Sequence, residues 1–238
     1  MNEPEQSRTL RIDGVLNARD VGGLTGELGT VRRGLVFRAA CLSGLTPAGA
    51  SGLARTGLRT VIDLRTALER QQEPNRVTGA PELAGVREVC VELLTTLQDL
   101  PVVSEELYRH LVERCGPGIV AVFEELATPG TLPALVHCLV GKDRTGLTVA
   151  LLLDLLGVER AAILADYLES NLGLGDRAHT QVRAEILEGT LAGLDEIHGS
   201  PQGYLVAHGL TDATIRALRT ALLTWPTKAP TTKVEPAR

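Results

Sequence analysis

Residues 135–146 read Leu-Val-His-Cys-Leu-Val-Gly-Lys-Asp-Arg-Thr-Gly, an apolar run followed by a cysteine, a glycine and charged residues. The apolar run predicts a buried strand, and the apolar residues beyond Thr145 predict a helix. A strand-to-helix turn points several backbone N–H groups into one concavity, and the helix N-terminus adds a partial positive charge. The turn between strand and helix is therefore predicted to bind a phosphate-like anion.

Two side chains of this turn carry the predicted chemistry. A thiol at a helix N-terminus beside Lys142 and Arg144 ionises more readily than an isolated thiol, so we predict that Cys138 is a nucleophile. The planar guanidinium of Arg144 can bind two phosphate oxygens at once, which a lysine does poorly. The predicted phosphate-binding residues are Leu139, Val140, Gly141, Lys142, Asp143 and Arg144.

A departing alcohol or phenol needs a proton, and the sequence offers several carboxyl groups as the general acid. Asp143 lies within the turn itself. Asp63 ends another predicted strand, and ligands bind off the carboxyl ends of parallel strands. Asp20, next to Arg19, is a third candidate, for which an Asx turn that organises the loop is the alternative. We expect His137 to orient the turn by a hydrogen bond rather than to act as a base.

The turn resembles the signature loop of a known family. His137-Cys138-x5-Arg144-Thr145-Gly146 is similar to the loop of the cysteine-dependent protein tyrosine phosphatases, and its Lys-Asp pair resembles a bacterial subgroup of them. Further stretches that match follow in the expected order, at residues 17–23, 38–40, 61–65 and 165–171. The resemblance covers residues 10–225 and departs at Leu139 and Val140, where many relatives have a smaller or more polar pair.

This resemblance implies a metal-independent phosphatase that forms a cysteinyl-phosphate intermediate and uses no cofactor. The expected partners are phosphotyrosine proteins, with dual specificity or phosphoinositides as further possibilities. Resemblance to the Lys-Asp subgroup favours Asp143 over Asp63 as the acid, and Lys142 is expected at the pocket rim, where it would bind a second phosphate. Thr145 and Arg19 are expected to support the site. The alternative is a catalytically silent module that binds phosphotyrosine or phosphoinositides.

Composition sets the remaining expectations. A chain of 238 residues, 44% of them hydrophobic, predicts one domain at residues 11–224, between a flexible N-terminus at 1–10 and a disordered tail at 225–238. A net charge of -5 and 3% aromatic residues argue against nucleic acid as a partner. The four cysteines show neither metal-ligand spacing nor a disulfide framework. With no secretory signal and no apolar run long enough for a bilayer, we expect a cytoplasmic protein.

The predicted elements alternate between strands and helices. Strands are predicted at residues 35–38, 59–64, 86–93 and 135–137. Helices are predicted at residues 47–55, from 104 onward, and at 117–126, 145–156, 161–171, 176–191 and 212–223. This order indicates an α/β sandwich of the tyrosine phosphatase type, with a central mixed, partly parallel sheet and a helical C-terminal half. The helix at 176–191 is expected to pack in the ordinary way, with a lid over the pocket as the alternative.

Overall fold

The computed structural model describes residues 7–94, 105–174 and 181–224. The strands are β1 (Arg19–Asp20), β2 (Thr25–Gly26), β3 (Gly29–Val31), β4 (Val36–Ala39), β5 (Thr60–Asp63), β6 (Arg87–Cys90), β7 (Ala134–His137) and β8 (Leu223–Thr224). The helices are α1 (Pro47–Ala54), α2 (Ala67–Gln72), the 3₁₀ turn η1 (Pro81–Leu83), α3 (Glu105–Ala127), α4 (Asp143–Leu155), α5 (Arg160–Leu174), α6 (Ala184–His198), α7 (Pro201–Ala207) and α8 (Asp212–Leu222).

The main sheet has the strand order β1-β4-β7-β5-β6. Strands β4, β7, β5 and β6 are parallel, whereas β1 runs antiparallel to β4, so the predicted mixed, partly parallel sheet is confirmed. His137 at the end of β7 lies opposite both Ala39 of β4 and Asp63 of β5. The carboxyl ends of three strands therefore meet at one edge, with Cys138 directly beyond the middle strand.

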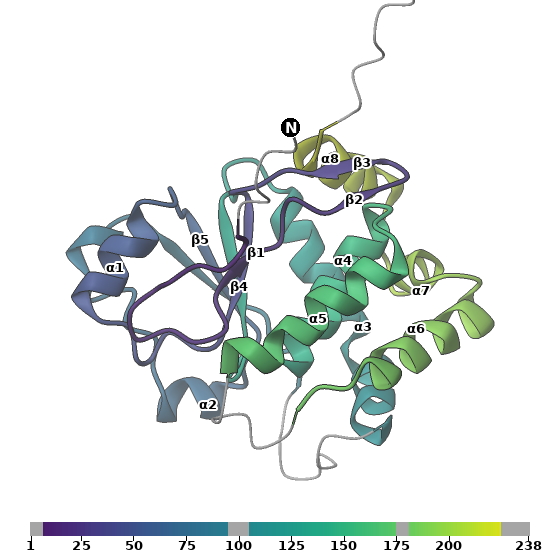
Figure 1. The fold of residues 1–238 in the computed structure, drawn as a ribbon, viewed down its shortest axis with the longest axis horizontal. Helices are drawn as coiled ribbons and strands as arrows, with labels where there is room; N and C mark the ends of the chain where they lie inside the picture. The colour runs from purple at the N-terminus through teal and green to yellow at the C-terminus, as the bar shows by residue number, and fades with distance from the viewer. Residues whose placement is uncertain (1–6, 95–104, 175–180, 225–238) are drawn as a thin grey trace, which may run out of the picture.

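Alternate side chains of the sheet enter two separate cores. Val61 and Leu135 pack into the core on the α1 side, and Ile62 and Val136 pack into the core formed with the C-terminal helices. Figure 1 shows α1 on one side of the sheet and α3, α4 and α5 on the other. Each fully buried aliphatic side chain contributes about 1.5–3 kcal/mol relative to exposure. Burial on both faces explains why these strands are continuous apolar runs.

Helix α4 is the central helix, as its apolar sequence predicts. Almost every residue from Arg144 to Leu155 is buried, so the helix is covered on all sides. It begins at Asp143, two residues before the predicted start at residue 145. An acidic residue in the first turn of a helix interacts favourably with the helix dipole, which favours the earlier start.

Two predicted helices are one in the structure. Helix α3 runs without interruption from Glu105 to Ala127, with Pro117 inside it. The break predicted before Pro117 is wrong, because Leu107, Leu111, Cys115 and Ile119 recur every fourth residue and bury one continuous stripe across the proline. The packing of this stripe outweighs the backbone hydrogen bond that proline cannot make. The start predicted at residue 104 lies outside the described residues.

Helix α6 also differs from its prediction. It begins at Ala184, after an extended Arg183, and continues to His198, where Gly199 ends it with a φ of 75°. The predicted range of 176–191 is therefore wrong at both ends, and residues 176–180 lie outside the described part of the chain. The buried side chains of α6 are Ile186, Leu187, Leu191 and Leu194. They face α3, α5 and α7, which is the ordinary packing that the sequence favours.

Residues 8–10 pair with the chain around β1. Arg8 accepts a backbone hydrogen bond from Asp20, and Leu10 donates one to Ala18, so these residues run along β1 as a further edge segment. The limits of the domain stay a prediction. Residues 1–6 and the predicted tail at 225–238 lie outside the described residues. A second, small sheet joins β2, β3 and β8. Within the described ranges, none of the helices has the length and apolar character needed to span a membrane.

Candidate active site

The turn after β7 runs from Cys138 to Lys142 and leads directly into α4. Cys138 is 3% exposed at the start of the loop, and Arg144 lies in the first turn of α4. Among the described residues, the backbone N–H groups of Leu139, Val140 and Gly141 donate no hydrogen bond. These donors and the N-terminus of α4 fit the predicted binding of an anion.

Gly141 has a backbone conformation that only glycine adopts without strain here. Its φ is +70°, and a Cβ at this position would lie 2.2 Å from the carbonyl oxygen of Ala39. The outward carbonyl of Gly141 accepts hydrogen bonds from Asn17 Nδ2 at 3.0 Å and from Arg38 Nη2 at 2.9 Å. Two other segments of the chain therefore hold the back of the loop.

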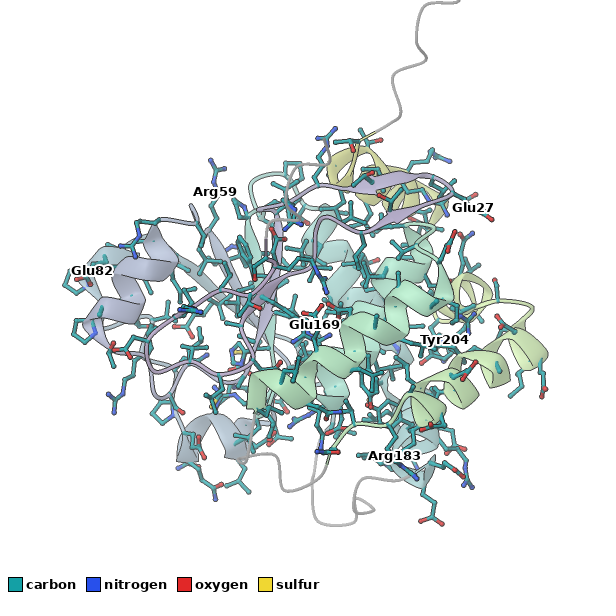
Figure 2. All side chains as sticks on the ribbon, viewed as in Figure 1. Glu27, Arg59, Glu82, Glu169, Arg183 and Tyr204 are labelled. Carbon is teal, nitrogen blue, oxygen red and sulfur yellow. The ribbon has the colours of Figure 1, made fainter. Side chains whose placement is uncertain are left out.

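A buried ionic cluster fixes these supporting residues. Arg19 donates to Asn17 Oδ1 at 2.5 Å and to Asp166 Oδ1 at 3.2 Å, and Arg38 donates to Asp166 Oδ2 at 2.7 Å. Arg8 adds a contact of 2.8 Å to Asp166 and a hydrogen bond to Glu169, which Figure 2 labels on α5. Burial alone would raise the pKa of Asp166, but the three guanidinium groups lower it well below its usual value.

Asp20 organises a loop. Its carboxylate accepts from the backbone N–H of Gly22 and of Gly34, each at 2.8 Å. The Asx turn considered for Asp20 is therefore present, and both carboxylate oxygens are used in it.

Arg144 is held by a carboxylate from the neighbouring strand-to-helix turn. Its Nη1 and Nη2 donate to Glu69 Oε2 and Oε1 at 2.7 and 2.6 Å. Glu69 also closes a capping box with Thr66 at the start of α2. Burial raises the pKa of Glu69, yet the hydrogen bonds from Arg144 outweigh burial and lower it overall. The guanidinium is thus fixed in orientation by a carboxylate that stays ionised.

Asp143 has the environment of an acid that keeps its proton. Its side chain is 21% exposed, with Lys142 Nζ 3.7 Å from Oδ2 and the Tyr108 hydroxyl donating to Oδ1 at 3.3 Å. Burial raises the pKa of Asp143, and the opposing effects of Lys142, Tyr108 and Arg144 are too small to cancel this rise. A raised carboxyl pKa suits proton donation near neutral pH.

Lys142 is buried beside Asp143. Its side chain is 6% exposed, and its ammonium lies 3.7 Å from Asp143 Oδ2. The contact with a second substrate phosphate that the sequence suggests stays a prediction. The long aliphatic stem is covered as part of the helix start.

Asp63 and His137 form a second buried network beside Cys138. Arg65 Nη2 donates to Asp63 Oδ2 at 2.7 Å, and Asn75 Nδ2 donates to the same oxygen at 3.1 Å. Burial raises the pKa of Asp63, but Arg65 and His137 lower it overall, which favours the carboxylate over the acid. His137 is completely buried and its pKa is lowered, chiefly by burial. Its Nδ1 lies 2.9 Å from the Cys138 carbonyl, the orienting contact expected for it.

Comparison with known proteins shows the family of the chain. The model of the tyrosine phosphatase family matches residues 10–224. The chain belongs to the tyrosine phosphatase family. It is 32% identical to a tyrosine-protein phosphatase of Nostoc commune, over 78% of this chain and 73% of that protein. It is 29% identical to the triple specificity protein phosphatase PtpB of Mycobacterium tuberculosis, over 89% of this chain and 98% of that protein.

Solved phosphatase structures resemble the fold. The catalytic domain of the PP-IP phosphatase SIW14 from S. cerevisiae matches with a TM-score of 0.45 and 19% identity, over 70% of this chain and 85% of that one. The P. aeruginosa TpbA structure matches with a TM-score of 0.44 and 18% identity, over 74% and 86% of the two chains. By family and by its relatives, the protein is a tyrosine-protein phosphatase.

Two residues of the candidate site were not predicted from the sequence. Glu69 could have been found from Thr66-x-x-Glu69, a capping box that directly follows a predicted strand. Tyr108 gave no such signal, because its place beside Asp143 depends on how α3 packs. Thr145, predicted to support the site, is buried, and its hydroxyl makes no hydrogen bond to the described residues.

Proposed function

We propose that this phosphatase hydrolyses phosphotyrosine in proteins through a cysteinyl-phosphate on Cys138. The observation that carries the proposal is the position of Cys138 at the start of a loop that leads to Arg144 and to an acid with a raised pKa. The nucleophile, the arginine that binds phosphate and the proton donor thus come from one segment of seven residues, 138–144. The catalytically silent module considered from the sequence would not need the last of these.

In the first step, the Cys138 thiolate attacks phosphorus and the bond from phosphorus to the tyrosine oxygen breaks. Asp143 gives its proton to that oxygen, so tyrosine leaves as the neutral phenol. Arg144 and the backbone N–H groups of the loop bind the equatorial oxygens, where negative charge is concentrated in the transition state. Glu69 keeps the Arg144 guanidinium in place during this step.

In the second step, water attacks the phosphorus of the cysteinyl-phosphate and the sulfur–phosphorus bond breaks. Asp143, now ionised, accepts a proton from this water and is thereby returned to its acidic form. Inorganic phosphate leaves, and the Cys138 thiolate is restored. The two steps together convert the phosphate ester and water into the free phenol and inorganic phosphate, and neither step requires a metal ion or a cofactor.

The substrate class is tested by steady-state hydrolysis in the presence of EDTA. A phosphotyrosine peptide, a phosphoserine peptide and a panel of phosphoinositides are compared by kcat/KM. We expect activity in EDTA, with the phosphotyrosine peptide preferred. The name of PtpB records triple specificity for that relative, so phosphoinositides are the second candidate substrates here. Dependence on an added divalent ion would contradict the proposal.

The covalent step is tested with Cys138→Ser. A serine hydroxyl stays protonated in this site, so we expect turnover to fall below detection while vanadate binding, measured by calorimetry, is largely kept. Arg144→Lys should lose nearly as much activity, because a point charge replaces a two-pronged donor. If the serine variant retains more than a small fraction of activity, a mechanism without a cysteinyl-phosphate is required.

The general acid is tested with Asp143→Asn and with Asp63→Asn as the matched variant. Loss of a general acid costs about a hundredfold to ten-thousandfold, and costs least when the leaving group is a good one. We expect Asp143→Asn to slow phenyl phosphate far more than 4-nitrophenyl phosphate. Asp63→Asn should slow both equally, since it disturbs the contacts of Arg65 and His137. The opposite pattern would assign the acid to Asp63.

A further inference from the structure

Two tyrosines that the reaction scheme does not use lie behind Asp143. The hydroxyls of Tyr108 on α3 and Tyr167 on α5 are 2.5 Å apart, and their rings meet edge to face at 83° with centroids 6.2 Å apart. Both side chains are buried, at 0% and 1% exposure. Tyr108 also donates to Asp143 Oδ1 at 3.3 Å. The three groups form a continuous chain of hydrogen bonds that ends at the proposed acid.

The need of two buried hydroxyls for a hydrogen-bond partner does not explain this arrangement. A buried phenol usually finds one hydrogen-bond partner, and each of these tyrosines already has one in the other. The contact of Tyr108 with Asp143 is additional. The close approach of Tyr167 depends on the loop signature itself, because a Cβ on Gly146 would lie 3.1 Å from the Tyr167 ring. The glycine that ends the signature therefore makes room for the second tyrosine.

The direction of the hydrogen bonds follows from proton counting. Each phenol has one proton, and an ionised carboxylate can only accept. Burial raises the pKa of both phenols, so both remain protonated at neutral pH. When Tyr108 donates to Asp143, its own oxygen is left to accept from Tyr167. Tyr167 thus supports the orientation in which the Tyr108 proton points to Oδ1.

We propose that Tyr108, supported by Tyr167, is a positioning residue for the general acid: its hydroxyl holds Oδ1 of Asp143 and leaves the transferable proton on Oδ2. The inference rests on the proposed function, in which Asp143 is the acid. Within residues 7–94, 105–174 and 181–224, the charged and titratable groups that face Asp143 are Lys142 and Arg144 at the start of α4, Tyr108 from α3 and Tyr167 from α5. Of the two tyrosines, Tyr108 is the one that donates directly to the carboxylate.

The sign of the expected pH effect follows from the donor. A hydrogen bond to the ionised carboxylate stabilises that form, so Tyr108 lowers the pKa of Asp143. Tyr108→Phe removes the bond and raises this pKa further. Activity that needs the protonated acid is lost as pH rises through its pKa, so the alkaline limb of kcat/KM moves to higher pH. We expect a shift of about half a unit to one unit.

The experiment compares Tyr108→Phe and Tyr167→Phe with Tyr204→Phe. Tyr204, labelled in Figure 2, is the third tyrosine of the chain, and its buried hydroxyl donates to the Val112 carbonyl on α3 at 2.8 Å. Loss of the Tyr204 hydroxyl removes a buried hydrogen bond to α3, the helix that carries Tyr108, and leaves the contacts of Asp143 unchanged. All three variants are assayed with 4-nitrophenyl phosphate and phenyl phosphate across pH, and their Tm values are measured.

For Tyr108→Phe, we expect phenyl phosphate to lose about tenfold in kcat/KM and 4-nitrophenyl phosphate to lose less, together with the alkaline shift. Tyr167→Phe should give a smaller change of the same kind, and it tests the inference even if Tyr108→Phe folds poorly. Tyr204→Phe should lower Tm without moving the limb. In an Asp143→Asn background, Tyr108→Phe should no longer change the leaving-group dependence.

These experiments separate failure of the positioning role of Tyr108 from failure of the assignment of Asp143 as the acid. If Asp143→Asn depends on the leaving group but neither tyrosine variant moves the limb or the substrate ratio, the positioning role is overturned and the proposed function stands. If Asp143→Asn itself lacks leaving-group dependence, the assignment of the acid fails and the positioning role fails with it.

Discussion

At the scale of single residues, the loop after β7 places the ammonium of Lys142 beside the carboxyl group of Asp143. Lys142 is 5% exposed, and its ammonium lies 3.7 Å from Asp143 Oδ2. Its sequence position alone suggested a contact with a second substrate phosphate. In the structure, the ammonium of Lys142 opposes the rise in the pKa of Asp143 that burial causes.

Lys142→Met tests this role. Loss of the positive charge should raise the pKa of Asp143 and move the alkaline limb of kcat/KM to higher pH. The loss in kcat/KM should be about tenfold and similar for a phosphotyrosine peptide and a phosphoinositide, because the acid serves both. A loss confined to the phosphoinositide would show that Lys142 binds a second phosphate.

At the scale of elements, the start of α2 and the start of α4 are joined through one carboxylate. Glu69 belongs to the capping box of α2 and binds both terminal nitrogens of Arg144. The contact between Glu69 and Arg144 thus links two strand-to-helix turns at the carboxyl edge of the sheet. Such a contact between turns fixes the guanidinium more firmly than the flexible arginine side chain could do alone.

Glu69→Gln is expected to separate the two roles of this residue. A glutamine can still accept the Thr66 backbone N–H and start α2, but its amide opposes one N–H group of Arg144. We expect kcat/KM to fall by about tenfold to a hundredfold while helix content, measured by circular dichroism, is kept. Glu73→Gln is the control at the other end of α2, where the exposed carboxylate accepts from Ser43. Equal losses in the two variants would argue against a role in orienting Arg144.

The elements also show which features a sequence can predict. Strand β7 and helix α4 follow from local apolar patterns and turn residues, and the partly parallel sheet follows from the alternation of strands and helices. The chemistry assigned to the loop stays a prediction. The continuity of α3 does not follow from local patterns, because Pro117 is a local signal to stop and only packing across the whole helix overrides it. Tyr108 reaches Asp143 through that same packing. Contacts between segments far apart in the chain are thus what the sequence did not reveal.

At the scale of the whole molecule, buried ionised carboxylates near the candidate active site couple the stability of the protein to pH. Asp166, Asp63 and Glu69 are buried, and the pKa of each is lowered by guanidinium partners. Their stabilisation is complete above the unfolded values of about 3.9–4.3 and is lost as pH falls toward the folded values. The pKa values of Asp143 and Asp154 are raised in the folded protein. Protonation of these two groups as pH falls therefore stabilises the fold and offsets part of this loss.

Asp166→Asn tests how much of the acid sensitivity comes from the cluster of three arginines. Removal of one partner from a buried ionic cluster typically costs about 3–5 kcal/mol, so we expect a lower Tm at pH 7. We also expect a shallower fall of Tm between about pH 5 and 3, since the variant has no carboxylate to protonate there. Asp195→Asn, which removes an exposed partner of Arg160, is the control and should change Tm little. If the variant and the wild type lose Tm in parallel across this range, the acid sensitivity originates in other carboxylates, and the cluster of Asp166 with its three arginines supports the loop after β7 without making it sensitive to acid.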